Sequence, residues 1–154
     1  MRIAVCGAAR EDAHAMVLAE EVGRRIALAG AVLVCGGLGG VMEAAARGAH
    51  QAAGLTIGVL PGGEARDANA WITLPLPTAM GEARNVLVVR FADAVIAIGG
   101  EWGTLSELAL AAKIGKPVVL LQHNLAMGLP LPVAASPADA VALALRQARE
   151  RMER

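Results

Sequence analysis

The stretch 92–107 constrains the fold more than any other part of the chain. It begins with an unbroken apolar run through Ile98, which is typical of a strand buried on both faces. A turn with three glycines follows, and the Ala/Leu-rich run that continues to Ile114 predicts a helix. Such a unit brings free backbone N–H groups and the positive end of a helix to one turn, where an anion is stabilised. We therefore predict a phosphate-binding site between this strand and this helix.

The same alternation of strand and helix patterns runs along the whole chain. Apolar runs predict further strands at 2–6, 31–34, 55–60, 71–74 and 118–121, and a brief edge strand at 131–134. Helical patterns cover 11–29, 41–53, 79–91 and the segment that begins after Ser136. Alternating strands and helices form parallel sheets with right-handed crossovers and helices on both faces. We predict a single domain over residues 1–154, a Rossmann-like three-layer sandwich around a mostly parallel sheet of six or seven strands.

Composition narrows the partners that such a domain would have. Glycine, proline or a charge interrupts each apolar run before it reaches the length of a membrane span, and no signal-peptide pattern opens the chain. We therefore expect a cytoplasmic protein without a membrane partner. A formal net charge of zero and an aromatic content of 2% argue against a nucleic-acid partner. Cys6 and Cys35 lack a paired histidine spacing, so we expect buried cysteines at strand ends and neither a metal site nor a disulfide.

A second glycine-rich turn follows the predicted strand 31–34. It contains Gly36, Gly37, Gly39 and Gly40, whereas the turn after the first strand has only Gly7. This is not the spacing of a dinucleotide-binding fingerprint, which follows the first strand. Two interpretations are open: the glycines permit close packing of a helix on a strand, or they hold a phosphate together with the other turn. Because the carboxyl ends of parallel strands share one edge of a sheet, all three turns are expected to meet there.

Three polar side chains near this edge are candidates for chemistry. The pattern Thr-x-x-Glu at 104–107 predicts a capping box, in which Glu107 bonds back to the N–H of the cap residue. A carboxylate in the first turn of a helix, beside a phosphate loop, is also placed to act on a sugar held by that phosphate. Arg84 is either a surface arginine or lies across the crevice from Glu107, where it would donate two hydrogen bonds to a phosphate or a carboxylate.

Together these motifs resemble a known family. Residues 99–107, Gly-Gly-Glu-Trp-Gly-Thr-Leu-Ser-Glu, are similar to the Pro-Gly-Gly-x-Gly-Thr-x-x-Glu motif of proteins long labelled "possible lysine decarboxylase". Those proteins are now placed with the LOG (Lonely Guy) cytokinin-activating phosphoribohydrolases. Residues 35–42, Cys-Gly-Gly-Leu-Gly-Gly-Val-Met, resemble the first glycine motif of the same family. The decarboxylase label finds no support, because no lysine stands at a recognisable pyridoxal-binding motif.

The residues in these motifs are more similar to those of a sister group of the LOG enzymes. That group contains the molybdenum cofactor carrier proteins, and the resemblance spans nearly the whole chain. It implies a homo-oligomer, either a dimer or a tetramer, with no required cofactor. The ligand that it implies is a phosphorylated small molecule: a molybdenum cofactor of the molybdopterin type, a nucleotide or phosphate itself.

For a LOG-like enzyme the resemblance implies hydrolysis of the N-glycosidic bond of a nucleoside 5′-monophosphate to free base and ribose 5-phosphate. The catalytic residues would be Arg84 and Glu107, with Glu107 assisting water or stabilising an oxocarbenium-like sugar. Three positions depart from the enzyme pattern: Gly99 replaces a proline, Glu101 replaces a glycine and Asn85 replaces a lysine. Since a carboxylate beside a bound phosphate is repulsive, these changes favour a carrier-like binding protein.

Both functions stay open at the level of sequence. The residues expected to bind the phosphorylated ligand in either case are Gly7, Gly36, Gly37, Gly39, Gly40, Arg84, Asn85, Gly99, Gly100, Glu101, Trp102, Gly103 and Thr104.

Overall fold

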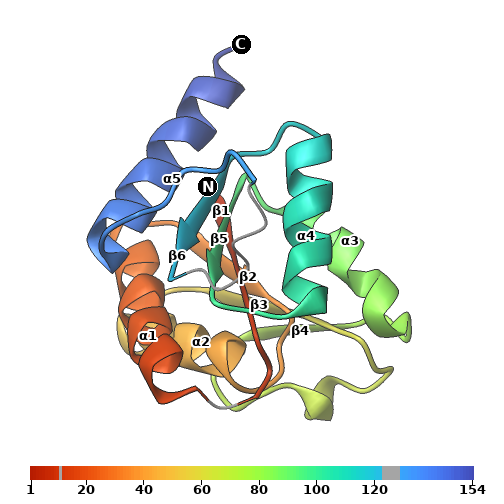
Figure 1. Ribbon diagram of the computed structural model, residues 1–154. Helices are drawn as coiled ribbons and strands as arrows, with labels where there is room; N and C mark the ends of the chain where they lie inside the picture. The colour runs from red at the N-terminus through yellow and green to blue at the C-terminus, as the bar shows by residue number, and fades with distance from the viewer. Residues whose placement is uncertain (11, 123–128) are drawn as a thin grey trace.

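The computed structural model describes residues 1–10, 12–122 and 129–154, and within them the strands and helices alternate (Figure 1). The strands are β1 (Arg2–Gly7), β2 (Val32–Cys35), β3 (Thr56–Leu60), β4 (Leu74–Pro77), β5 (Ala94–Ile98) and β6 (Val118–Leu121). The α-helices are α1 (Ala13–Leu28), α2 (Val41–Gln51), α3 (Asn85–Phe91), α4 (Trp102–Lys113) and α5 (Pro137–Met152). Short 3₁₀ turns are η1 (Ala65–Asp67) and η2 (Gly81–Arg84).

In the described residues the strands form one six-stranded sheet in the order β4-β3-β2-β1-β5-β6, and every pairing is parallel. The chain builds the sheet outward from β1 to β4 and then returns to place β5 on the other side of β1. The strand order therefore reverses between β1 and β5, which is where parallel α/β sheets bind ligands. Cys6 pairs with Ala97 and Gly7 with Ile98, so both strands end at the same level. The predicted fold class is confirmed.

Helices cover both faces of the sheet. Helices α1, α2 and α5 lie on one face, and α3 and α4 lie on the other (Figure 1). Alternate residues of β1 enter the two cores: Ile3 and Val5 face the first group of helices, whereas Ala4 and Cys6 face the second. None of the helices in the described part of the chain combines the length and apolar character that crossing a bilayer requires.

The two helices that follow β1 and β2 pack unusually closely. A Cβ built on Gly48 of α2 would lie 1.9 Å from the carbonyl oxygen of Glu20, and one built on Gly23 of α1 would lie 1.9 Å from that of Ala45. Only hydrogen atoms on these two Cα positions allow the helix backbones to approach so closely.

Several local predictions are wrong in detail. The strand predicted at 71–74 forms instead at Leu74–Pro77. It contains two prolines, which are tolerated because β4 is an edge strand. The helix predicted from residue 79 opens as the 3₁₀ turn η2 and becomes α-helical only at Asn85. The edge strand predicted at 131–134 is reduced to a single bridge between Leu120 and Val133.

Other local predictions are confirmed. Ser136 caps α5 by accepting a hydrogen bond from the N–H of Asp139, with Pro137 in the first turn. Cys6 and Cys35 are buried free cysteines at the ends of β1 and β2. The start predicted for the first helix, residue 11, lies outside the described residues, and α1 begins after Asp12, whose side chain caps it.

Candidate functional site

A cavity of about 350 Å³ opens at the carboxyl ends of β1, β2 and β5, at the reversal of strand order. Its walls come from the end of β1 and the following turn, from the glycine turn after β2, from η2, and from the first two turns of α4. The lining residues are Val5, Cys6, Gly7, Ala8, Ala9, Gly36, Leu38, Met42, Glu82, Arg84, Asn85, Glu101, Gly103, Thr104 and Glu107.

The structure brings about half of the predicted site residues to this cavity. Those that line it are Gly7, Gly36, Arg84, Asn85, Glu101, Gly103, Thr104 and Glu107. The cavity lining does not include Gly37, Gly39, Gly40, Gly99, Gly100 or Trp102. Trp102 is 81% exposed, so its side chain points into solvent at the start of α4.

Arg84 is the most unusual residue of the cavity. Its side chain is 8% exposed, although it stands at the end of a short 3₁₀ turn. One terminal nitrogen, Nη2, donates a long hydrogen bond of 3.4 Å to the carbonyl oxygen of Gly36, and Nη1 donates to Oδ1 of Asn85. The Nε–H group is buried and has no hydrogen-bond partner among the described residues, and none of their carboxylates lies within ion-pairing distance of the guanidinium. A buried cation without a counter-charge is costly, and an anion that entered the cavity would lower this cost.

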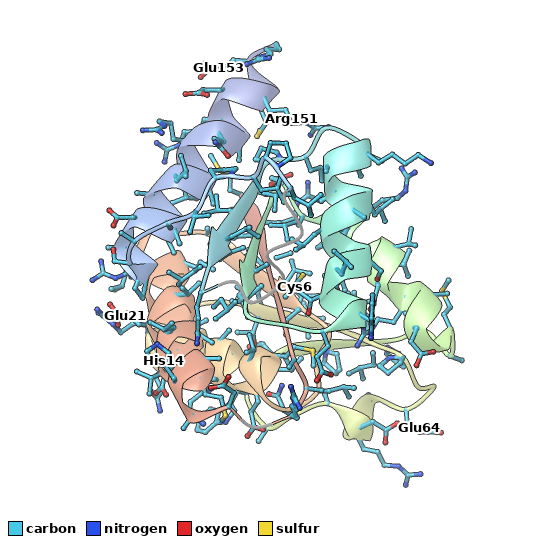
Figure 2. All side chains as sticks on the ribbon, viewed as in Figure 1. Cys6, His14, Glu21, Glu64, Arg151 and Glu153 are labelled. Carbon is cyan, nitrogen blue, oxygen red and sulfur yellow. The ribbon has the colours of Figure 1, made fainter. Side chains whose placement is uncertain are left out.

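Glu107 faces the same cavity from α4 and is 7% exposed. Burial raises the pKa of its carboxyl group to about 7, against the opposing effects of a hydrogen bond from the Cys6 thiol and the positive charge of Arg84. Burial likewise raises the pKa of the Cys6 thiol well above its usual range, and the neighbouring Glu107 adds to that shift. Figure 2 shows Cys6 in the interior, between the sheet and α4. The sequence analysis predicted only that Cys6 is a buried cysteine. Its position at the end of β1 was the signal from which its place in the cavity lining could have been predicted.

The predicted capping box at Thr104 and Glu107 is wrong. Helix α4 begins at Trp102, because Glu101 is the last residue with an extended backbone, and Glu101 makes no side-chain cap bond. Thr104 therefore lies inside the first turn and cannot act as the cap residue. The Glu107 carboxyl group is thus not used to begin the helix and is free to face Cys6 and Arg84.

The glycines of the two turns serve different purposes. Gly100 has φ +120°, and a Cβ on it would lie 2.5 Å from Thr104 Oγ1, so this turn needs glycine to pack on Thr104. Gly40 has φ +62°, and its Cβ would lie 2.3 Å from the carbonyl oxygen of Ala8. Gly40 therefore packs closely on the loop after β1, which leaves no room for a Cβ. Gly103 has neither a positive φ nor a close neighbour, since its Cβ would lie 3.8 Å from Asn85 Nδ2.

Glu101 lines the cavity and forms an ion pair at its mouth. Its carboxylate pairs with Arg10 at 2.8 Å, which ties the turn before α4 to the loop after β1. Both side chains are more than half exposed, so the pair contributes little to stability. The positive charge of Arg10 partly offsets the negative charge of Glu101, which weakens the repulsion that Glu101 would exert on an anion in the cavity.

Asn69 holds the second glycine turn in place. Its side-chain Nδ2 donates to the carbonyl oxygens of Leu38 at 2.9 Å and of Gly37 at 3.3 Å, and its backbone N–H donates to Gly37 at 2.9 Å. Asn69 belongs to the polar loop 64–70, and the cavity lining contains none of the residues of this loop. Its contribution is to fix the carbonyls of the turn that forms one wall of the cavity.

Comparisons with known proteins agree with this geometry. The model of the SLOG cluster4 family matches residues 1–147. An uncharacterized protein of Archaeoglobus fulgidus is 46% identical over 123 residues, which are 79% of this chain and 80% of that protein. The molybdenum cofactor binding protein from the phototrophic bacterium Rippkaea orientalis has a similar structure, with a TM-score of 0.88 and 37% identity over 94% of this chain and 95% of that chain. The Moco carrier protein from Chlamydomonas reinhardtii matches with a TM-score of 0.85 and 37% identity over 97% of this chain and 98% of that one.

Proposed function

Because the chain belongs to the SLOG cluster4 family, we propose that it is a carrier-like protein that binds a phosphorylated small molecule without turning it over. The ligand is a molybdopterin-type cofactor or a nucleotide. Its anionic group occupies the cavity between the ends of β1 and β5, beside Arg84 and the first turn of α4.

The buried guanidinium of Arg84 carries this proposal. A cation that is 8% exposed and has no carboxylate partner within the described residues is stabilised when an anion enters the cavity. Its unpartnered Nε–H supplies a hydrogen bond for an oxyanion, and such charge-assisted bonds are the strong ones. The start of α4 adds the partial positive charge of a helix N-terminus to the same wall.

The similar proteins support the kind of ligand. The structures from Rippkaea orientalis and Chlamydomonas reinhardtii are named for binding or carrying the molybdenum cofactor. The cavity volume of about 350 Å³ lies within the range of small-molecule pockets, roughly 300–1,000 Å³. Cofactor bound here would be cargo, held by Arg84 through its phosphate.

Replacing Arg84 by glutamine tests the proposal. We expect Arg84→Gln to weaken sulfate or phosphate binding about 10- to 100-fold, because a hydrogen bond to a charged group contributes roughly 1.5–3 kcal/mol. The ligand-free variant should melt at the same temperature as the wild type or higher, since the substitution removes an uncompensated buried charge. Arg146→Gln is the matched control, because that arginine is exposed on α5.

Calorimetric titration and thermal shift measure both effects on the same samples. Full anion affinity in Arg84→Gln would contradict the proposal, and so would an equal loss in Arg146→Gln. A panel of molybdate, nucleoside monophosphates and phosphate then identifies the class of ligand from the size of the shift.

One observation favours a second function, that of a LOG-like phosphoribohydrolase. Glu107 and Arg84 line one cavity, and a carboxyl group whose pKa is about 7 is matched to proton transfer at neutral pH. Incubation of the pure protein with AMP, followed by an assay for free adenine, separates the two functions. Adenine release that is abolished in Glu107→Gln would establish the hydrolase and refute the carrier.

A further inference from the structure

The Glu107 carboxyl group occupies an unusual position for a site that receives anions. It lines the same cavity as Arg84, is 7% exposed, and has no cation within ion-pairing distance among the described residues. The guanidinium of Arg84 is directed instead to the carbonyl of Gly36 and the side chain of Asn85. Ionised Glu107 would therefore be a buried, unpaired negative charge within the space that the ligand's anionic group enters.

None of the other titratable groups near Glu107 in the described residues forms an ion pair with it, although the Cys6 thiol and the charge of Arg84 partly stabilise an ionised carboxylate. These titratable groups come from the ends of β1 and β2, from η2 and from the start of α4, and they are Cys6, Cys35, Glu82, Arg84 and Glu101. The thiols are neutral, Glu82 and Glu101 are acidic, and Arg10 pairs with Glu101 rather than with Glu107. Among the described residues that line the cavity, Arg84 thus carries the only positive charge, and this charge is needed to bind the ligand.

We propose that at mildly alkaline pH the cavity takes up one proton with each oxyanion that it binds, and that Glu107 carries this proton. The inference rests on the proposed anion-binding function of the same site. A protonated Glu107 removes the repulsion between carboxylate and ligand, and its O–H becomes a second hydrogen-bond donor beside the Nε–H of Arg84. The proton comes from solvent and stays on the carboxyl group, so no bond of the ligand changes.

The pH dependence follows from where the proton is held. Burial already raises the pKa of Glu107 to about 7 before a ligand binds, and a neighbouring anion raises it further. Below about pH 7 the carboxyl group is protonated in both states, so the affinity is constant there. Above about pH 7 each bound anion must recruit a proton, and the affinity falls about tenfold for each unit of pH.

Calorimetric titration with sulfate tests this inference directly. Sulfate is the right probe because its charge is constant between about pH 5.5 and about pH 8.5, whereas phosphate itself titrates in this range. Titration at about pH 8 in buffers with different ionisation enthalpies counts the protons taken up. We expect about one proton per sulfate at about pH 8 and close to none at about pH 5.5. This measurement needs no variant.

Two variants assign the proton to its residue. Glu107→Gln should bind sulfate with the same affinity at all these pH values, about tenfold tighter than the wild type at about pH 8. Glu82→Gln is the matched control, because Glu82 also lines the cavity but is exposed, and it should retain the wild-type pH dependence.

The outcomes separate the inference from the function on which it rests. Sulfate binding without proton uptake, or a pH dependence that survives in Glu107→Gln, overturns the inference and leaves the anion site in place. Failure of the wild type to bind sulfate at any of these pH values overturns both.

Discussion

Gly36 offers the sharpest test of how the cavity holds its arginine. A Cβ at this position would lie 2.5 Å from Arg84 Nη2 and 2.6 Å from Met42 Sδ. Because real Cβ contacts are not shorter than 3.0 Å, Gly36→Ala must displace the guanidinium by at least about 0.5 Å. The hydrogen bond from Nη2 to the Gly36 carbonyl is already 3.4 Å long and will break.

The expected cost of Gly36→Ala falls on binding rather than on folding. Gly36 has no positive φ, and the atoms that its Cβ meets belong to the ends of flexible side chains, so we expect a stability change within about 1 kcal/mol. Loss of one properly directed charged hydrogen bond costs roughly 1.5–3 kcal/mol. This corresponds to sulfate binding that is about 10- to 100-fold weaker.

Gly63→Ala is the matched control for this experiment. Gly63 lies outside the cavity lining, and its Cβ would lie 3.8 Å from the nearest atom, Ala79 Cβ, which is an ordinary contact. We expect Gly63→Ala to bind sulfate within about twofold of the wild type and to unfold at an equal or higher temperature, because alanine lowers the conformational entropy of the unfolded chain. Calorimetric titration at about pH 6 measures both affinities. Wild-type affinity in Gly36→Ala, or an equal loss in Gly63→Ala, would refute the reasoning.

Three further predictions concern stability and assembly. Gly48→Ala places a Cβ 1.9 Å from the Glu20 carbonyl oxygen. The gain in helix propensity of about 1 kcal/mol offsets part of this clash, so we expect a net loss of about 2 kcal/mol of unfolding free energy and a Tm lower by about 4–8 °C. An unchanged Tm would show that α1 and α2 can separate freely. The folded-state pKa of Glu107, about 7, lies above its usual 4.5, so the folded state binds the proton more tightly than the unfolded state. As the pH rises from 4.5 to 7, the wild type should lose about 3 kcal/mol of unfolding free energy, and Glu107→Gln should lack that loss in denaturant titrations. Equal pH profiles of the two proteins would contradict the burial of a neutral carboxyl group. The face of α3 beside β4 exposes Leu87 and Phe91, and we expect this apolar face to form an interface between two copies of the chain. Light scattering at tens of micromolar should find at least a dimer for the wild type and a monomer for Leu87→Glu. A monomeric wild type would contradict this prediction.

The sequence determined the architecture because its signals are local. Apolar runs separated by helical patterns predicted parallel strands, whereas the strand order, with its reversal between β1 and β5, is seen only in the structure. Glycine turns after strands predicted where the crevice would lie. One of the two interpretations of Arg84, that it lies across from Glu107, came from chain order, since the two residues precede and follow β5, and the structure places both in one cavity.

Local patterns were misleading where a neighbouring strand or loop decides the outcome. The Thr-x-x-Glu pattern at 104–107 satisfies a capping box in isolation, yet α4 begins at Trp102 and Glu107 is used elsewhere. Pro75 and Pro77 are residues that usually interrupt a strand, because proline has no backbone N–H. They are tolerated in β4 because this strand pairs with β3 along only one edge, and its other edge needs no partner.

The chemical state of the site was decided only by the tertiary structure. Whether Arg84 has a counter-charge, and whether Glu107 is ionised, depends on how completely β1, η2 and α4 exclude water from the two groups. Cys6 and Glu107 lie 101 positions apart, and they meet only because β1 is inserted beside β5. The sequence alone predicted that the turns after the strands would meet at one edge of a parallel sheet, because the alternation of strands and helices is a local pattern. The burial and pairing of the charged groups, and therefore their protonation, arise from contacts between segments that are distant in the chain.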